Sequence, residues 1–166
     1  MARTKRTGLD KIDRRILNEL QANNLISNTD LAGRVFTSEA SCLRRVKRLR
    51  ANGWIHRDTS IVDPNRAPNK MTIIINVTLA REGADIVDRF MRVMRETTEV
   101  RQCYKVAGET DFVIVVAVKD IEAYDVFADR MFQSNNNVLR FNSFIALRCY
   151  KFDTGIEFDI DDTDDC

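Results

Sequence analysis

The residues with the clearest chemical character are the basic side chains of residues 38–50, SEASCLRRVKRLR. Cys42, Val46 and Leu49 recur at the spacing of an apolar helical stripe, so the opposite face of this helix is expected to carry polar groups. Arginine can contact guanine with two nitrogens or pair with a phosphate, and a glutamate near the helix start can accept from cytosine. The outward face is expected to hold Ser41, Arg44, Arg45 and Arg48, with Lys47 and Arg50 at the flanks.

A helix of this kind, placed after a short helix and a tight turn, has the arrangement in which a recognition helix enters the major groove of DNA. A basic segment with His56 and Arg57 follows it and is expected to form a wing. We therefore predict that the chain binds double-stranded DNA through these residues: Ser38, Glu39, Ser41, Arg44, Arg45, Lys47, Arg48 and Arg57.

A second group of polar residues is the run Gly108-Glu109-Thr110-Asp111-Phe112. Glycine permits positive φ angles, and threonine and aspartate favour turns, so the run by itself is typical of a hairpin turn between strands. The residue types alone therefore predict a turn and leave a role in ligand binding open.

Several kinds of chemistry are disfavoured by what the chain contains. His56 is the one histidine, and the four cysteines lack the spacing of a zinc site or a disulfide framework. We expect no metal, no cofactor and no catalytic residues. No apolar run approaches the roughly 20 residues of a membrane span, so we expect a soluble cytoplasmic protein without a membrane partner.

The charge is unevenly distributed although the net charge is only +1. Residues 1–60 carry 13 Lys and Arg against 6 Asp and Glu, a net charge of +7, and the remainder carries −6. Only the first part of the chain is therefore expected to meet a polyanion.

The elements that position these groups follow from periodicity. The segment LDKIDRRILNELQAN (9–23) and residues 28–35 predict two helices capped by Asp10 and Ser27, and the third helix begins at Ser38 and ends at Asn52-Gly53. Residues 54–63 predict two short strands, and the prolines of DPNRAPN indicate a linker.

Beyond the linker, strands and helices alternate in the order βαββαβ, which predicts a ferredoxin-like sheet with two helices on one face. We thus predict an α+β protein with four parts: a winged helix-turn-helix domain (1–62), a linker (63–70), a ferredoxin-like sensing and dimerisation domain (71–152) and an acidic, disordered tail (153–166). A second subunit is expected to cover the open face of the sheet.

The succession LDKIDRRILNELQAN, LAGRV and SEASCLRRVKRLRANGWI, followed by a βαββαβ unit with GETDF, resembles the leucine-responsive and asparagine-synthesis regulator family (Lrp/AsnC). The resemblance implies a transcriptional regulator of amino-acid metabolism whose DNA binding or assembly responds to a small amino acid. It also implies a homodimer that assembles further, to a tetramer or an octamer.

In this family the turn between the second and third strands lies in the effector pocket. The resemblance therefore implies these effector-binding residues: Gly108, Glu109, Thr110, Asp111, Asn142 and Ser143. The chain departs from the family at Phe36, where a glycine is usual, and at Asp58, where an aromatic residue is usual. Arg50 stands where family members often have glutamate.

Two other classes of function remain open at this point. One is an enzyme on a dimeric ferredoxin-like fold, although the second domain has no histidine to serve it. The other is a ligand-sensing adaptor whose helical domain docks another protein. Salt-dependent binding to duplex DNA separates both from a regulator.

Overall fold

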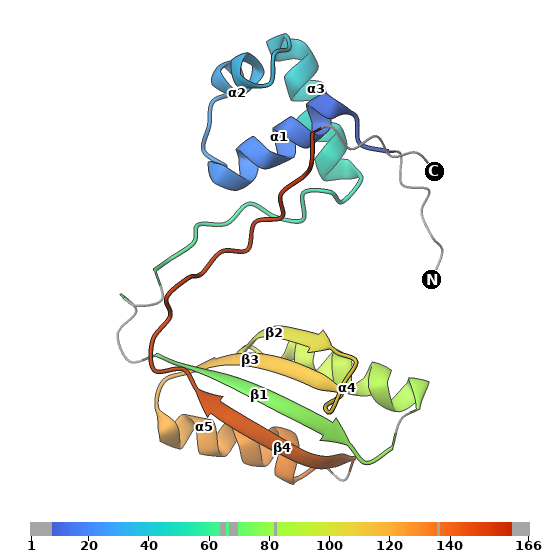
Figure 1. Ribbon diagram of the computed structural model, residues 1–166, viewed down its shortest axis with the longest axis vertical. Helices are drawn as coiled ribbons and strands as arrows, with labels where there is room; N and C mark the ends of the chain where they lie inside the picture. The colour runs from blue at the N-terminus through green and yellow to red at the C-terminus, as the bar shows by residue number, and fades with distance from the viewer. Residues whose placement is uncertain (1–7, 64–65, 67–69, 82, 136, 161–166) are drawn as a thin grey trace. The chain divides into compact units, whose positions relative to one another are not determined.

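The computed structural model describes residues 8–63, 66, 70–81, 83–135 and 137–160, and the chain divides into two compact units (Figure 1). Unit 1 joins the residues up to Ile61 with the segment from Phe152 onward, and unit 2 runs from Val62 to Lys151. The C-terminal segment, which we predicted as a separate tail, therefore groups with the first unit. Most of the predicted linker and residues 161–166 lie outside the described residues.

Unit 1 contains the three predicted helices, α1 (Lys11–Ala22), α2 (Asn28–Arg34) and α3 (Glu39–Ala51). Each begins where the sequence provides a capping side chain. The Asp10 carboxylate accepts from the backbone of Ile12 and Asp13, and the Asp13 carboxylate accepts from the Asp10 N–H in return, which completes a capping box. The hydroxyl oxygens of Ser27 and Ser38 accept from the N–H groups of Asp30 and Ser41 and so cap α2 and α3.

The core of unit 1 lies where the apolar stripes of the three helices meet. Ile16 of α1, Val35 at the end of α2 and Cys42 of α3 have no exposed surface. Trp54 and Phe158 are partly buried against this cluster, so the C-terminal segment contributes to the core. Burial of this stripe fixes which face of α3 remains outside.

The expected strands of the wing are absent from the described residues 54–63. Trp54 and Ile55 turn back, and the N–H groups of both donate to the carbonyl of Leu49. The described residues after them are exposed and pair with no other strand. A two-stranded hairpin without such support is only marginally stable. This detail of the prediction is therefore wrong, whereas the helix-turn-helix itself is confirmed.

Unit 2 has the predicted βαββαβ order. Its elements are β1 (Met71–Leu79), α4 (Ala84–Glu96), β2 (Val100–Lys105), β3 (Phe112–Val118), α5 (Ile121–Ala128) with a π-helical turn η2 (Asp129–Gln133), and β4 (Val138–Ile145). The strands form one antiparallel sheet in the order β2-β3-β1-β4. The ferredoxin-like prediction is confirmed.

Both helices of unit 2 cover one face of the sheet (Figure 1). Alternate residues of β1 and β3, among them Ile75 and Ile114, are fully buried beneath Phe90 and Phe127. The opposite face is open and carries Ile74, Phe144 and Tyr104, which are 39%, 56% and 53% exposed. Val93 of α4 and Ile121 of α5 are exposed at 43% and 47%. No helix in the described part of the chain is long and apolar enough to cross a membrane.

Candidate nucleic-acid interface and ligand site

The start of α3 is fixed by contacts with α2. The Ser38 hydroxyl oxygen accepts from the N–H of Ser41 at 3.4 Å, and the Asn28 amide donates to the carbonyl of Glu39 at 3.1 Å. Ser41 is half-buried, whereas Ser38 and Glu39 are exposed. The first turn of α3 is therefore held at the surface with polar groups accessible.

The outward face of α3 differs from the predicted one. Its exposed stripe consists of Ala40, Leu43, Arg44, Lys47 and Arg48, spaced i, i+3, i+4, i+7 and i+8, so Arg44 and Arg48 are exposed as predicted. Lys47 is therefore central to this face, where we had placed it at the flank. Leu43, which is 45% exposed, was missed because a leucine inside a helix is normally assigned to the core.

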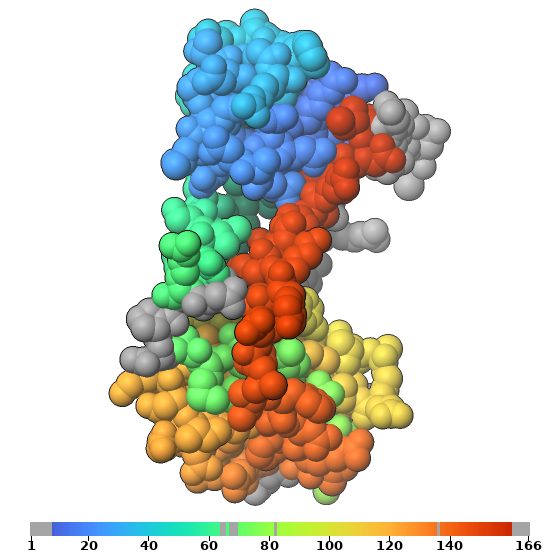
Figure 2. All heavy atoms as spheres, turned by 60° about the vertical axis from the view of Figure 1, so that its left-hand side comes forward, coloured from blue at the N-terminus to red at the C-terminus, as the bar shows by residue number. Residues whose placement is uncertain are grey.

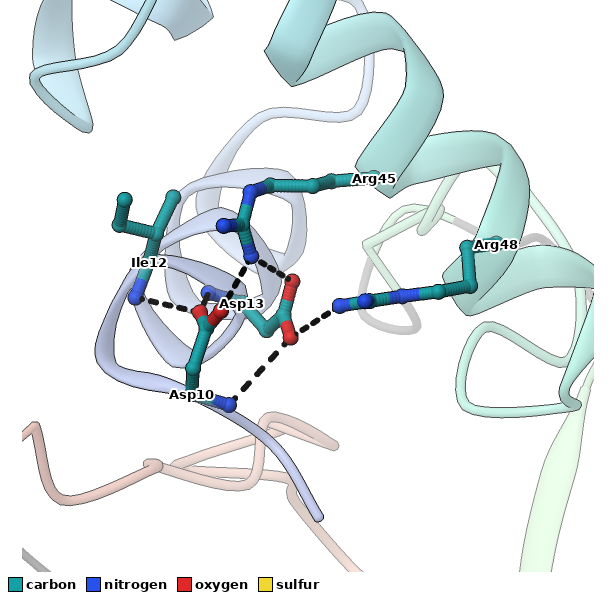
Figure 3. A network of polar contacts seen from close by, with 5 residues as sticks. All are labelled: Asp10, Ile12, Asp13, Arg45 and Arg48. Carbon is teal, nitrogen blue, oxygen red and sulfur yellow. Dashed lines mark hydrogen bonds and ion pairs between the residues drawn. The ribbon is translucent and has the colours of Figure 1, made fainter. Parts of the chain in front are cut away.

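Arg45 and Arg48 are held by carboxylates of α1, as Figure 3 shows. Arg45 Nη1 pairs with Asp13 Oδ1 at 2.9 Å and with Asp10, while Arg48 Nη2 pairs with the other oxygen of Asp13. The Asp13 side chain is only 1% exposed, and those of Arg45 and Arg48 are 19% and 49% exposed. The prediction that Arg45 faces outward is thus wrong, since this side chain is drawn between α3 and α1.

The network changes the acidity of its partly exposed members. Burial raises the pKa of Asp10, but hydrogen bonds from Arg45 and from the backbone of Asp13 and Ile12 outweigh it, so the pKa of Asp10 lies below 3.8. The hydrogen bond to Asp10 raises the pKa of Arg45 above its ordinary value. Both groups are therefore charged at neutral pH, and they join α1 to α3.

Arg50 and Asp58, which both depart from the family pattern, form an ion pair with one another. Arg50 Nη2 donates to both carboxylate oxygens of Asp58 at 3.1 and 3.0 Å. Arg50 is therefore less available to a phosphate than its position at the helix end indicates. His56 and Arg57, immediately before Asp58, are exposed.

Phe36 occupies the turn between α2 and α3 with a φ of 58°, in the left-handed region that favours glycine. Its ring is 79% exposed, and the guanidinium of Arg15 lies 5.4 Å from the ring centroid. The turn therefore keeps the conformation that a glycine would provide, at a cost of about 1 kcal/mol in backbone strain.

The run 108–111 forms the turn between β2 and β3, as its residue types predicted. Gly108 has a φ of 154°, which other residues rarely adopt, and both Gly108 and Glu109 are exposed. Asp111 Oδ2 accepts from the Leu79 N–H at 2.7 Å, and the Thr110 hydroxyl donates to the Val77 carbonyl at 2.7 Å. Asp111 therefore also has a structural role, because it binds the Leu79 N–H at the point where the register between β1 and β4 shifts.

The other two predicted effector residues lie on β4, at the far edge of the sheet, with β1 between them and the turn. Asn142 is opposite Asn76 on the open face, whereas Ser143 is on the helix face, where its hydroxyl is hydrogen-bonded to the Tyr124 hydroxyl. The two residues thus lie on opposite faces of the sheet.

The described residues contain no cluster of His, Cys, Asp or Glu that could hold a metal ion. Burial raises the pKa of the Cys42 and Cys103 thiols, which keeps both protonated at neutral pH. These two cysteines serve packing.

A helix-turn-helix with a basic recognition helix, joined to a ferredoxin-like domain, is the architecture of a DNA-binding transcriptional regulator. Residues 9–56 match the winged helix-turn-helix DNA-binding family, and residues 72–156 match the Lrp/AsnC ligand-binding domain. The chain belongs to the Lrp/AsnC family of transcriptional regulators.

Relatives and solved structures agree with this assignment. An HTH-type transcriptional regulator of Sinorhizobium fredii is 42% identical over 84% of this chain and 82% of its own, and the leucine-responsive regulatory protein of Escherichia coli K12 is 37% identical over 72% and 74%. The structure is similar to an AsnC family regulator from Agrobacterium tumefaciens, with a TM-score of 0.79 and 31% identity over 89% and 96% of the chains. It is also similar to a Neisseria meningitidis regulator in complex with L-methionine, with a TM-score of 0.79 and 28% identity over 93% and 98%. These relatives are regulators and not enzymes.

Proposed function

We propose that the chain regulates genes of amino-acid metabolism in the cytoplasm, and that a small amino acid bound by unit 2 changes its DNA binding or assembly. The observation that carries the DNA-binding part is the exposed stripe of α3, where the cationic Arg44 and Lys47 lie beside the accessible Leu43. The amino-acid effector is supported by the match to the Lrp/AsnC ligand-binding domain and by the L-methionine complex of a similar structure.

We assign base contacts to the first turns of α3, with Ser38, Glu39 and Ser41 at its start and Arg44 and Lys47 along its exposed stripe. The Leu43 side chain is suited to the methyl group of thymine. Arg48 and Arg57 are assigned to phosphates, because half of the Arg48 side chain remains accessible beside Asp13. Arg45 is assigned a positioning role, since its guanidinium is occupied by α1.

The test uses duplexes that the parent protein selects from a random library. Arg44→Ala should weaken binding by about 1–3 kcal/mol and relax the base preference at one position. A phosphate contact such as Arg57 should weaken all duplexes alike and reduce the salt slope by about one. Lys119→Ala in unit 2 is the matched control and should change neither. Unchanged affinity in Arg44→Ala and Lys47→Ala would show that α3 does not read DNA.

For the effector, we assign the turn residues Gly108, Glu109, Thr110 and Asp111 to one side of the pocket, and Asn142 and Ser143 to the other. Asn142 and Ser143 lie on opposite faces of the sheet, and the proposed pocket is completed by another subunit. A thermal-shift screen of the twenty amino acids should identify the effector, since a ligand at 100 times its Kd stabilises by about 2.7 kcal/mol. An absence of any shift would count against amino-acid sensing.

The proposed assembly is a homodimer that forms a tetramer or octamer. It is supported by the open sheet face, whose apolar side chains include Ile74, Val115 and Phe144 in one cross-strand row. Sedimentation at micromolar concentration tests this, and Phe144→Asp should lower the mass of the particle.

A further inference from the structure

The C-terminal segment is bound to α1 through its backbone. The Asn18 amide donates to the Phe158 carbonyl and accepts from the Phe158 N–H, both at 2.9 Å. Gln21 makes the same pair of bonds with Ile156, at 2.8 and 2.7 Å. Each side-chain amide thus satisfies both polar backbone groups of one residue, in the manner of a strand pairing with its neighbour.

Two further contacts fix the position and direction of the segment. The Phe158 ring packs edge-on against Trp54, with the centroids 6.4 Å apart, and Arg14 Nη1 donates to the Asp159 carbonyl at 3.3 Å. Gln21, Asn18 and Arg14 bind Ile156, Phe158 and Asp159 in that order. The segment therefore runs toward the N-terminal end of α1. Figure 2 shows the segment in red against the blue helices of unit 1.

The bound segment has a charge opposite to that of the rest of unit 1. Its described residues 152–160 contain three carboxylates and no lysine or arginine, whereas residues 1–60 have a net charge of +7. Asp153, Glu157 and Asp159 lie in the described part and are exposed. The segment approaches the end of α1 where Asp13 holds Arg45 and Arg48 of the recognition helix.

We propose that this segment is an autoinhibitory strap, bound to α1 in order to lower the affinity of unit 1 for DNA. Its carboxylates reduce the positive potential that attracts phosphates, while its backbone bonds to α1 hold them on the unit that carries the basic helix. This proposal rests on the DNA-binding role of α3, and the strap would regulate that role. A ligand or partner that releases the strap would therefore raise DNA affinity.

The contacts separate charge from docking, because the bonds to Asn18 and Gln21 use only the backbone of the strap. The variant Asp153→Asn/Glu157→Gln/Asp159→Asn keeps these backbone bonds, and Trp54 fluorescence checks that its segment remains docked. It should bind DNA roughly fivefold more tightly, with a steeper salt dependence. The assay is fluorescence anisotropy of the full chain with a library-selected duplex between 50 and about 200 mM salt.

The control variant is Asp85→Asn/Asp88→Asn/Glu96→Gln, which removes the same charge from exposed positions of α4 in unit 2. It should change DNA affinity less than twofold. An equal effect of the two triple variants, or no effect of the strap variant, would overturn the proposal.

A second arm removes docking and keeps the charge. In Asn18→Ala/Gln21→Ala the strap is released, so neutralising its carboxylates should give a much smaller gain than in the parent. Trp54 fluorescence reports both release and folding, and Gln21→Ala alone, which breaks the more exposed pair, replaces the double variant if that variant is unfolded. If neutralising the carboxylates raised DNA affinity as much in Asn18→Ala/Gln21→Ala as in the parent, docking of the strap would be irrelevant. Failure of the parent to bind any duplex would instead overturn the DNA-binding role of α3.

Discussion

The ion-pair network at the N-terminus of α1 makes Asp13 the side chain on which unit 1 depends most. Asp13 is 1% exposed and accepts from Arg45, Arg48 and the Asp10 N–H. Asp13→Ala removes all three bonds at once and leaves Arg45, 19% exposed, with Asp10 as its remaining carboxylate partner. Breaking a buried pair costs about 3–5 kcal/mol, and the half-exposed Arg48 places this case near 3 kcal/mol.

A unit of this size is stable by about 4–11 kcal/mol, so a loss of about 3 kcal/mol is a large fraction of the total. The assay is urea unfolding followed by Trp54, the single tryptophan, which lies in unit 1 and therefore reports on that unit alone. With a slope of about 1 kcal/mol per molar urea, the midpoint should fall by roughly 2–3 M.

The matched control is Glu19→Ala on the same helix, which breaks the exposed pair between Glu19 and Arg34 at 2.9 Å. Such a pair contributes less than about 1 kcal/mol, so its midpoint should move much less. If the two variants unfolded at similar urea concentrations, the buried network would be an incidental contact and the reasoning would be refuted.

Three further outcomes are expected. Phe36→Gly should raise the free energy of unfolding of unit 1 by about 0.5–1 kcal/mol, because it relieves a φ of 58°, whereas Phe36→Ala should lower it; equal urea midpoints would contradict this. Because the pKa of Asp10 is lowered in the folded chain, its contribution to stability is complete above about pH 4 and is lost as the pH falls through the lowered value; Asp10→Asn should flatten this part of an acid titration. Asp111→Asn should retain the fold and the bond from the Leu79 N–H but lose the pairing with a ligand ammonium. Calorimetry should therefore show weaker binding of the identified amino acid and an unchanged melting temperature. Unchanged amino-acid affinity would return the turn to a purely structural role.

The sequence predicted those parts of the fold that depend on local patterns. Ser27 and Ser38 each combine a capping side chain with the apolar period of the helix that follows, and both helices begin there. The continuous apolar run FVIVVAV of β3 is typical of a central strand, and β3 lies between β2 and β1. In both cases the residues that predict the element lie within about a dozen neighbours along the chain.

The direction of Arg45 could not be predicted in this way. Its position is beside Val46 at the margin of the apolar stripe, from which a long side chain can turn outward or inward. The choice is made by Asp13, which is 32 residues earlier and also completes the capping box of α1. A side chain with two functions in the fold shows only the local one in its sequence context.

The C-terminal segment illustrates a stronger form of the same limit. Its acidic, aperiodic composition is that of a disordered chain, and its folding partner is more than 130 residues away at Asn18 and Gln21. Since those amides bind backbone groups that every residue possesses, nothing in the tail except Phe158 distinguishes the docked register. The chain therefore enters unit 1 twice, and unit 2 is joined to the DNA-binding unit at both of its ends. A change in unit 2 can thus act on α1 through the strap as well as through the segment that follows α3, which a chain with a free tail would not allow.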